Sequence, residues 1–301
     1  MTYDNCILFS FSFIFTSTVH LMVFSVISWD FNPEIFSIGN HGVRWYGLMI
    51  ALALFTGYLI FKRYLRGDKL TPEMVDSLLI HITIASIVGA RLGHCFFYEP
   101  DYFLKNPVEI LKVWKGGLAS HGWAIGILLA LWLYYRKYKI PFLWLMDRIV
   151  IVVALGAAFI RIGNFFNSEI YGLPTSLPWG VEFVRDRLYD STTGALLPTV
   201  PRHPTQLYEA LSYFLIFIAA FVFYRKRNME IRDGFIFSVF MIALFSARFL
   251  IEFVKNDQVA FEAGMSFNMG QLLSLPFIIA GIGMIVWTKV KPRYFSQEPT
   301  A

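Results

Sequence analysis

The sequence predicts an all-α polytopic membrane protein with about seven transmembrane helices and a small head segment outside the membrane. Of its 301 residues, 56% are hydrophobic and only 16% are charged, which is too apolar for a soluble domain. Several uncharged stretches are long enough to span a membrane, because a bilayer core of roughly 30 Å requires about 20 apolar residues per helix. Basic residues, in addition, are concentrated at alternate ends of these stretches.

Seven apolar stretches are predicted to be transmembrane helices. In chain order they are Val43–Phe61, Met74–Phe97, Ala119–Tyr135, Phe142–Phe166, Thr205–Phe223, Gly234–Val254 and Asn268–Trp287. An odd number of spans places the two ends of the chain on opposite sides of the membrane.

The positions of Lys and Arg predict the orientation of these helices. Basic clusters follow alternate stretches: Lys62, Arg63, Arg66 and Lys69; Arg136, Lys137 and Lys139; Arg225, Lys226, Arg227 and Arg232; Lys289, Lys291 and Arg293. By the positive-inside rule these ends are cytoplasmic. The N-terminus would then lie on the outer side of the membrane, and the C-terminal tail, 291–301, in the cytoplasm. The formal net charge of +5 therefore does not imply nucleic-acid binding.

The connection 167–204 is the only outer segment large enough to form a head. It is rich in Gly and Pro and contains the short apolar run Val181–Val184. We expect irregular structure with a short strand pair. With the seven helices, this segment would form one domain over 30–290.

Residues 1–29 are expected to be a poorly defined N-terminal extension. The stretch Ile7–Ile27 is apolar, but it contains six Ser or Thr residues and no flanking basic residue. It therefore lacks the positive region of a secretory signal. It could form a weak extra span, an interfacial helix, or untranslated sequence upstream of a true start at Met22. The last two readings are favoured, because an extra span would need a basic cytoplasmic anchor.

The sequence predicts no metal or cofactor. The two cysteines, Cys6 and Cys95, are far apart and do not have the spacing of a zinc site or a disulfide framework. The Asp, Glu and His residues do not cluster at metal-ligand spacing either.

Polar residues inside the predicted spans point to a functional site. A charged group there costs about 2.5–3.5 kcal/mol on insertion scales, so it needs a partner or a wet cavity. Arg161, Arg248 and His121 lie toward the outer half of their spans. Because the guanidinium fork matches phosphate oxygens and keeps its charge, two arginines at one depth suggest an anion site. A phospholipid head group and a transported anion would both suit it.

Each of these groups also has an ordinary structural explanation. Arg248 and Glu252 have the i, i+4 spacing of an intrahelical ion pair. Asp147 and Arg148 are expected to be interfacial anchors. His121 could be a satisfied polar residue at the membrane edge, although the glycines around it allow close backbone approach.

The segment Arg161–Glu169, which reads RIGNFFNSE, resembles the G-R-x-G-N-F-x-N-x-E signature of bacterial prolipoprotein diacylglyceryl transferases. Further segments resemble this family in order: Ile35–Gly39, Arg44–Leu48, Gly89–Gly93, Trp114–Gly122, Pro201–Glu209, Arg248–Phe253 and Met269–Ser274. Two positions depart from the family pattern. Ile160 replaces the first Gly of the signature, and Leu244 stands where the family often has Tyr.

The resemblance implies an enzyme of the bacterial inner membrane that needs no cofactor. Its substrates would be phosphatidylglycerol, entering laterally from the bilayer, and a prolipoprotein signal peptide with a lipobox cysteine. The diacylglyceryl group would move to the cysteine thiol, forming a thioether and releasing glycerol phosphate, as the first step of lipoprotein maturation. Carried over by position, the implicated residues are Tyr46, His121, Arg161, Asn164, Glu169, Arg248 and Glu252.

These residues suggest a mechanism. His121 would take the thiol proton, with Glu169 or a thiol polarised by arginine as alternatives. Arg161 and Arg248 would bind the phosphate and stabilise the leaving group.

The remaining residues would support this site. Glu252 would orient Arg248. Asn164 and Glu169 would hold the glycerol hydroxyls or fix Arg161, and Tyr46 would donate a hydrogen bond to a lipid oxygen. The competing hypothesis is a binding or transport protein for anionic solutes, and a purely structural scaffold would leave the membrane-depth arginines without a purpose.

Overall fold

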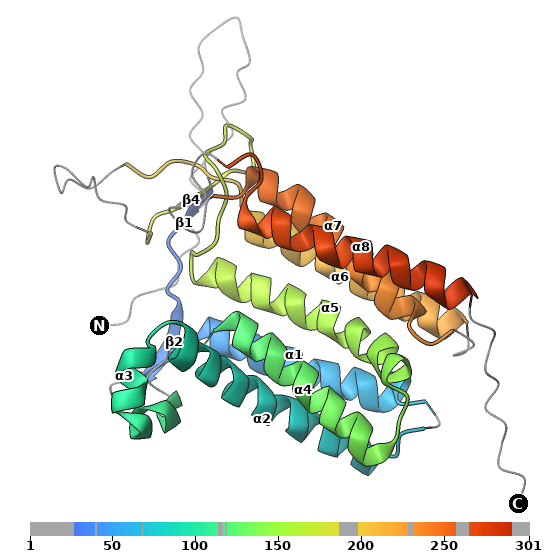
Figure 1. The fold of residues 1–301 in the computed structure, drawn as a ribbon. Coiled ribbons are helices and arrows are strands. Elements are labelled where there is room, and N and C mark those ends of the chain that lie inside the picture. The colour runs from blue at the N-terminus through green and yellow to red at the C-terminus, as the bar shows by residue number, and fades with distance from the viewer. Residues whose placement is uncertain are drawn as a thin grey trace, which may run out of the picture.

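Seven long helices dominate the computed structural model (Figure 1). The structure describes residues 27–290 except 40, 68, 114–116, 118, 187–197, 228–231 and 257–264. The long helices are α1 (Trp45–Ile60), α2 (Pro72–Phe97), α4 (Ser120–Tyr138), α5 (Phe142–Phe166), α6 (Thr205–Lys226), α7 (Phe235–Ile251) and α8 (Met269–Val290). Each overlaps one predicted stretch, so the all-α fold class is confirmed.

Six helical segments in the described part of the chain are long and apolar enough to cross a membrane. They are Trp45–Leu65, Pro72–Phe97, Phe142–Phe166, Thr205–Lys226, Phe235–Val254 and Met269–Thr288. The first combines α1 with the short π-helical turn η1 (Phe61–Leu65). Helix α4, which has 19 residues and carries Arg136 and Lys137 in its last turn, is not among the six. The polytopic membrane character is therefore confirmed, and the crossing of α4 remains a prediction.

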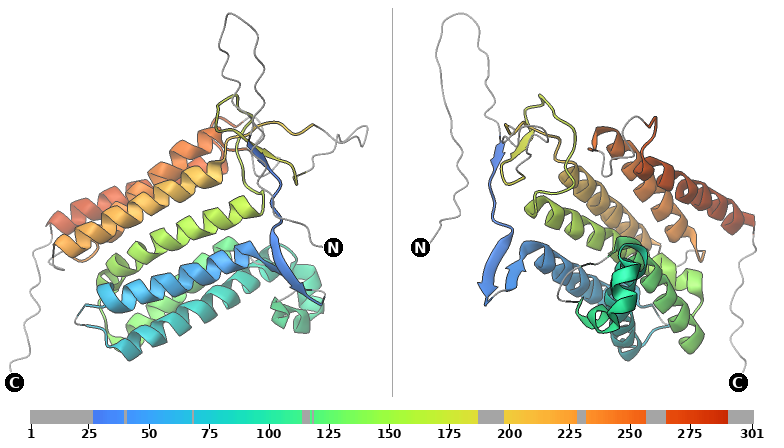
Figure 2. Two further views of the ribbon diagram at one scale, coloured as in Figure 1. Left: turned by 180° about the vertical axis from the view of Figure 1, so that it is seen from behind. Right: turned by 60° about the vertical axis from the view of Figure 1, so that its left-hand side comes forward.

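Helix α5 lies in the middle of the bundle (Figures 1 and 2). It packs against α1 on one side and α6 on the other, while α2 packs against α4 and α7 against α8. Half of the membrane-spanning window of α5 is buried, against at most 28% for any other span. Residues on α5 are therefore the ones best placed to contact both halves of the bundle.

The helices alternate in direction, so their ends gather in two groups. We call one group the head end; it contains Trp45, Phe97, Ser120, Phe166, Thr205, Ile251 and Met269. The opposite group, the basic end, contains the described members of the Lys and Arg clusters. This arrangement is the one that the predicted topology requires.

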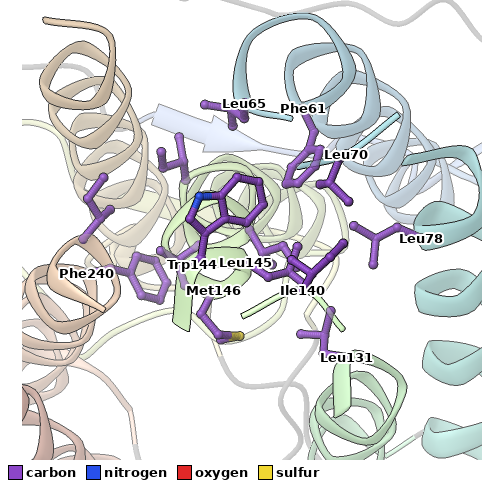
Figure 3. Packing of buried hydrophobic residues seen from close by; sticks show 14 of the residues in the cluster. Phe61, Leu65, Leu70, Leu78, Leu131, Ile140, Trp144, Leu145, Met146 and Phe240 are labelled. Atoms are coloured by element: carbon purple, nitrogen blue, oxygen red, sulfur yellow. The ribbon is translucent and has the colours of Figure 1, made fainter. Parts of the chain in front are cut away.

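The interior differs between the two ends of the bundle. Toward the basic end, an apolar core packs around α5, with Leu65, Leu131 and Leu145 fully buried (Figure 3). Toward the head end, the buried residues include many polar and charged ones: Arg91, Asn164, Gln206, Glu209, Glu252, Lys255 and Gln271. Close packing holds membrane helices together, because lipid provides little hydrophobic drive between them. Apolar packing is therefore concentrated toward the basic end, and buried polar and charged side chains toward the head end.

The sequence predicted Asp147 and Arg148 to be interfacial anchors, and this prediction was wrong. Their exposed fractions are only 3% and 4%. The Asp147 carboxylate accepts hydrogen bonds from the backbone N–H groups of Gly234 (2.6 Å) and Phe237 (2.8 Å). It therefore caps the start of α7, where backbone donors lack partners within the helix. Arg148 lies 3.4 Å from the centre of the Trp144 ring. Both side chains are therefore buried in the bundle and stabilise its packing.

The head contains little regular structure. Strand β4 (Val181–Phe183) pairs in parallel with β1 (Ile27–Trp29), which comes from the end of the predicted N-terminal extension. Val181 also forms an antiparallel bridge with Arg202. The strand that pairs with β4 thus comes from before the first helix, and only an isolated bridge comes from within 167–204. The rings of Trp29 and Phe165 also pack together, with centroids 4.4 Å apart.

Three shorter elements complete the head end. The antiparallel strands β2 (Glu34–Ile38) and β3 (His41–Arg44) form a hairpin that leads into α1. Helix α3 (Pro100–Lys105) and the 3-10 turn η2 (Pro107–Leu111) connect α2 toward α4. The predictions for residues 1–26, including Met22, for the tail 291–301 and for head residues 187–197 lie outside the described residues.

Glycines bring α2 and α4 into close backbone contact. A Cβ atom at Gly126 would lie 3.1 Å from the Cα of Gly89 and still closer to the carbonyl oxygen of Ala85. Small residues at such an interface permit the close packing that membrane helices use.

We expect Gly126→Ala to lower the free energy of unfolding by about 1–3 kcal/mol, because the added methyl group has no space against α2. Thermal unfolding in detergent would measure this loss. Gly283→Ala in α8 is the matched control, since nothing lies within 4 Å of a Cβ atom there. Equal stability of the two variants would contradict close α2–α4 packing.

Candidate active site

The end of α5 carries the signature segment and folds back on itself. The helix ends at Phe166, and Ser168 and Ile170 adopt left-handed backbone conformations with φ of 56° and 61°. This turn returns Glu169 toward the helix. Its Oε1 accepts hydrogen bonds from Asn164 Nδ2 (2.8 Å) and Asn167 Nδ2 (3.2 Å). The turn therefore fixes a carboxylate beside the last turn of α5.

Arg161 lies further inside α5 and is held from two directions. Its Nη1 donates to Asn164 Oδ1 at 3.1 Å, and its Nε lies 2.8 Å from Glu209 Oε2. The Arg161 side chain is only 16% exposed, whereas that of Glu209 is fully buried. Ion pairs of this kind are strong because little water screens them. The guanidinium orientation is thus set by α5 and α6 together.

The buried ion pairs continue from α6 to the end of α7. Glu209 Oε1 lies 3.5 Å from Lys255 Nζ, and Lys255 Nζ lies 3.3 Å from Glu252 Oε2. Neither Glu209 nor Lys255 is among the site residues predicted from the sequence. Glu209 could have been noticed, since it is a charged residue inside a predicted span. Lys255 gave no such signal, because it follows the last residue of its span.

The expected Arg248–Glu252 ion pair does not form. Helix α7 ends at Ile251, and Glu252 begins the 3-10 turn η4 (Glu252–Val254), so the α-helical i, i+4 geometry is not continued. Glu252 pairs with Lys255 instead. Within the described part of the chain, the Arg248 guanidinium forms no ion pair or hydrogen bond. It lies close enough to Tyr213 for the two groups to interact electrostatically.

Tyr46 joins the site from the start of α1. It packs over Gly163, where an added Cβ atom would lie 2.8 Å from the Tyr46 ring. Its phenol is close enough to Glu169 and Arg161 to interact electrostatically with both. We call Tyr46, Arg161, Asn164, Glu169, Glu209, Arg248, Glu252 and Lys255 the arginine cluster.

His121 is at the head end but separate from the arginine cluster. It is the second residue of α4 and is exposed. Its ring stacks on Tyr98, with centroids 5.7 Å apart, and meets the edge of Phe97 at 5.2 Å. Among the residues that the structure describes, no hydrogen bond, ion pair or ring contact joins His121 to the cluster.

Arg91 has a structural role. Its Nε donates to the carbonyl of Ile110 (3.0 Å) and its Nη2 to that of Glu109 (2.6 Å). Its guanidinium also lies 4.9 Å from the centre of the Phe103 ring. Arg91 therefore fixes α3 and η2 against the end of α2.

The arginine cluster can bind an anion. It combines three cationic side chains, those of Arg161, Arg248 and Lys255, with three carboxylates, and Arg248 has no carboxylate partner within the described ranges. The described residues contain no group of three or more His, Cys, Asp or Glu side chains arranged to hold a metal ion. The chemistry available from these residues is hydrogen bonding, charge stabilisation and proton transfer.

Comparison of the sequence with known proteins points to one family. Residues 33–287 match the family model described as prolipoprotein diacylglyceryl transferase. A protein of Tolumonas auensis named phosphatidylglycerol–prolipoprotein diacylglyceryl transferase is 44% identical over 89% of this chain and all of its own length. Proteins of the same name from Porphyromonas gingivalis (44% identical, 86% of this chain and 94% of the relative) and Chloroherpeton thalassium (41%, 89% and 96%) are also similar. The chain therefore belongs to the prolipoprotein diacylglyceryl transferase family.

Proposed function

We propose that this protein transfers the diacylglyceryl group of phosphatidylglycerol to the lipobox cysteine of prolipoproteins. Membership of the family and the names of three relatives that match most of their length support this reaction. The observation that carries it is the pair of arginines at the head end: Arg161 is fixed by a buried carboxylate, and Arg248 has no carboxylate partner among the residues that the structure describes. Such a pair suits a phosphate-bearing lipid.

The reaction is a displacement at a glycerol carbon. The cysteine sulfur forms a C–S bond to the terminal glycerol carbon of the diacylglyceryl group, and the C–O bond to phosphate breaks. Glycerol phosphate leaves with the bonding electrons, and the thiol proton passes to a base. Two tasks follow for the protein: to hold the phosphate as its charge changes, and to help form the thiolate.

Arg161 and Arg248 perform the first task in this proposal. Their guanidinium groups bind the phosphate and stabilise the leaving group in a site with little water. Asn164 holds Arg161 in place, since its amide also donates to Glu169. Glu169 and Tyr46 line the same site. Glu169 is suited to accept hydrogen bonds from the glycerol hydroxyls, and Tyr46 to donate one to a lipid oxygen.

His121 performs the second task. A neutral imidazole can accept a proton near neutral pH, and its position at the start of α4 exposes it at the head end. The lipobox peptide would approach from this side, between His121 and the arginine cluster.

The proposed orientation has the head end in the periplasm and the basic end in the cytoplasm of a bacterial inner membrane. The N-terminus is then periplasmic and the C-terminus cytoplasmic. The Lys and Arg distribution supports this assignment, because the described basic clusters lie at the end opposite the site.

A transfer assay tests the reaction. Purified protein, phosphatidylglycerol and a peptide with a lipobox cysteine are incubated in detergent, and the peptide mass is measured. We expect a diacylglyceryl mass increase on the cysteine, and at least about a 100-fold loss of rate in Arg161→Ala, because leaving-group stabilisation is removed. No increase with folded, lipid-binding protein would favour solute binding or transport.

Arg248→Lys is expected to reduce transfer about tenfold or more, since Lys keeps the charge but loses the paired donors. Arg63→Lys, at an exposed position of the basic end, is the matched control and should retain normal transfer. Near-normal turnover of Arg248→Lys would remove the guanidinium fork from the mechanism.

His121→Gln is expected to reduce transfer by about 10²–10⁴-fold while phosphatidylglycerol binding is retained, because Gln cannot accept the thiol proton. Binding of fluorescent phosphatidylglycerol, measured beside the transfer rate, separates the two effects. Normal transfer in this variant would assign proton removal to another group.

A further inference from the structure

On the basis of the proposed function, we infer that Lys255 is a positioning residue that keeps Arg248 available for the lipid phosphate. Lys255 does so by holding the Glu252 carboxylate, which would otherwise pair with Arg248. Lys255 does not need to touch the substrate for this role. Its effect is exerted through Glu252.

The sequence spacing alone favours a different pairing. Arg248 and Glu252 are four residues apart, and in a continuous helix such residues are neighbours. In the structure, Glu252 Oε2 lies 3.3 Å from Lys255 Nζ. No ion pair connects Glu252 to Arg248 in the described residues, although both lie at the end of α7. The competition between two cations for one carboxylate is therefore decided in favour of Lys255.

The backbone around Lys255 fixes its side chain in the interior. Lys255 forms an antiparallel bridge with Gly172, and Leu173 N donates to the carbonyl of Val254 at 2.9 Å. Asn256 N donates to the carbonyl of Tyr171 at 3.3 Å. Lys255 is only 5% exposed, and its Nζ also lies 3.5 Å from Glu209 Oε1. The segment after the signature thus attaches Lys255 to the site.

Helix α8 confines Glu252 from another direction. A Cβ atom at Gly270 would lie 2.5 Å from Glu252 Oε1, so the carboxylate occupies space that any other residue at this position would fill. Glu252 is therefore enclosed by Lys255 and Gly270.

The balance of charge explains why this arrangement matters. Glu209 already pairs with Arg161, and Lys255 lies between Glu209 and Glu252. Without the Lys255 charge, Glu252 would be buried without a cation, which is costly, and Arg248 is the cation nearest in sequence. A carboxylate bound to Arg248 would compete with the lipid phosphate.

Three Lys255 variants test this inference. Lys255→Met should raise the Kd and the KM for phosphatidylglycerol by about tenfold or more, because Glu252 then forms an ion pair with Arg248 and competes with the lipid phosphate. The KM for the lipobox peptide should not change. Adding Glu252→Gln to Lys255→Met removes the competing carboxylate and should return the Kd to within about threefold of the wild-type value. Lys255→Arg should bind normally, since it keeps the charge.

Lys112→Met is the matched control, because it also removes a lysine from an i, i+3 pair, here with Glu109 in the α3–η2 connection. It should bind phosphatidylglycerol normally. If Lys255→Met does not fold, Gly270→Ala replaces it: the added methyl group displaces Glu252, and weaker lipid binding is expected.

Unchanged affinity in Lys255→Met or Gly270→Ala would overturn the inference. So would a double variant that binds as weakly as Lys255→Met. Because affinity is measured with fluorescent phosphatidylglycerol in detergent micelles, this comparison does not depend on turnover. A wild-type protein that binds the lipid without transferring its diacylglyceryl group would refute the proposed function, and the affinities would still decide the role of Lys255.

Discussion

The buried ion pair between Arg161 and Glu209 is the interaction on which the site depends. It joins α5 to α6 at the head end, with 2.8 Å between Nε and Oε2 and a fully buried Glu209. Removing one partner of such a pair typically costs about 3–5 kcal/mol, since the other is left as an uncompensated buried charge. The pair therefore places Arg161 firmly, and it leaves the second oxygen of Glu209 for Lys255.

The contrast between the two ends of the bundle follows from this arrangement. Charges can be kept inside a membrane protein only where each has a partner or access to water. The head end meets this requirement through the arginine cluster, and the basic end avoids the problem by packing apolar side chains around α5. Even the buried Asp147 near the basic end is satisfied, because two backbone N–H groups of α7 donate to it. The apolar packing at the basic end thus supports the polar site at the head end.

The two proposed chemical tasks lie on different parts of the bundle. The arginine cluster is carried by α1, α5, α6 and the end of α7, whereas His121 belongs to α4, which packs on α2. Arg91 stabilises this second part through two carbonyl contacts with η2 and a third with Gly117, and through the Phe103 ring of α3. A buried arginine in a membrane helix is therefore not by itself a sign of a binding site. What distinguishes Arg248 is that, in the described structure, its guanidinium forms no hydrogen bond or ion pair, whereas that of Arg91 is held by backbone carbonyls.

The sequence by itself determined the fold class, the seven helical segments, the family and most of the candidate residues. Hydropathy and charge report which segments suit the membrane, and the RIGNFFNSE segment is specific because its polar residues are costly at membrane depth. The pairing of those residues was decided only by the tertiary structure. Arg161 forms an ion pair with Glu209, which lies 48 positions further along the chain. Glu252 pairs with Lys255 because α7 ends at Ile251, one residue before Glu252. Side-chain spacing predicts partners within one continuous helix, whereas these partners depend on helix ends and on packing between helices.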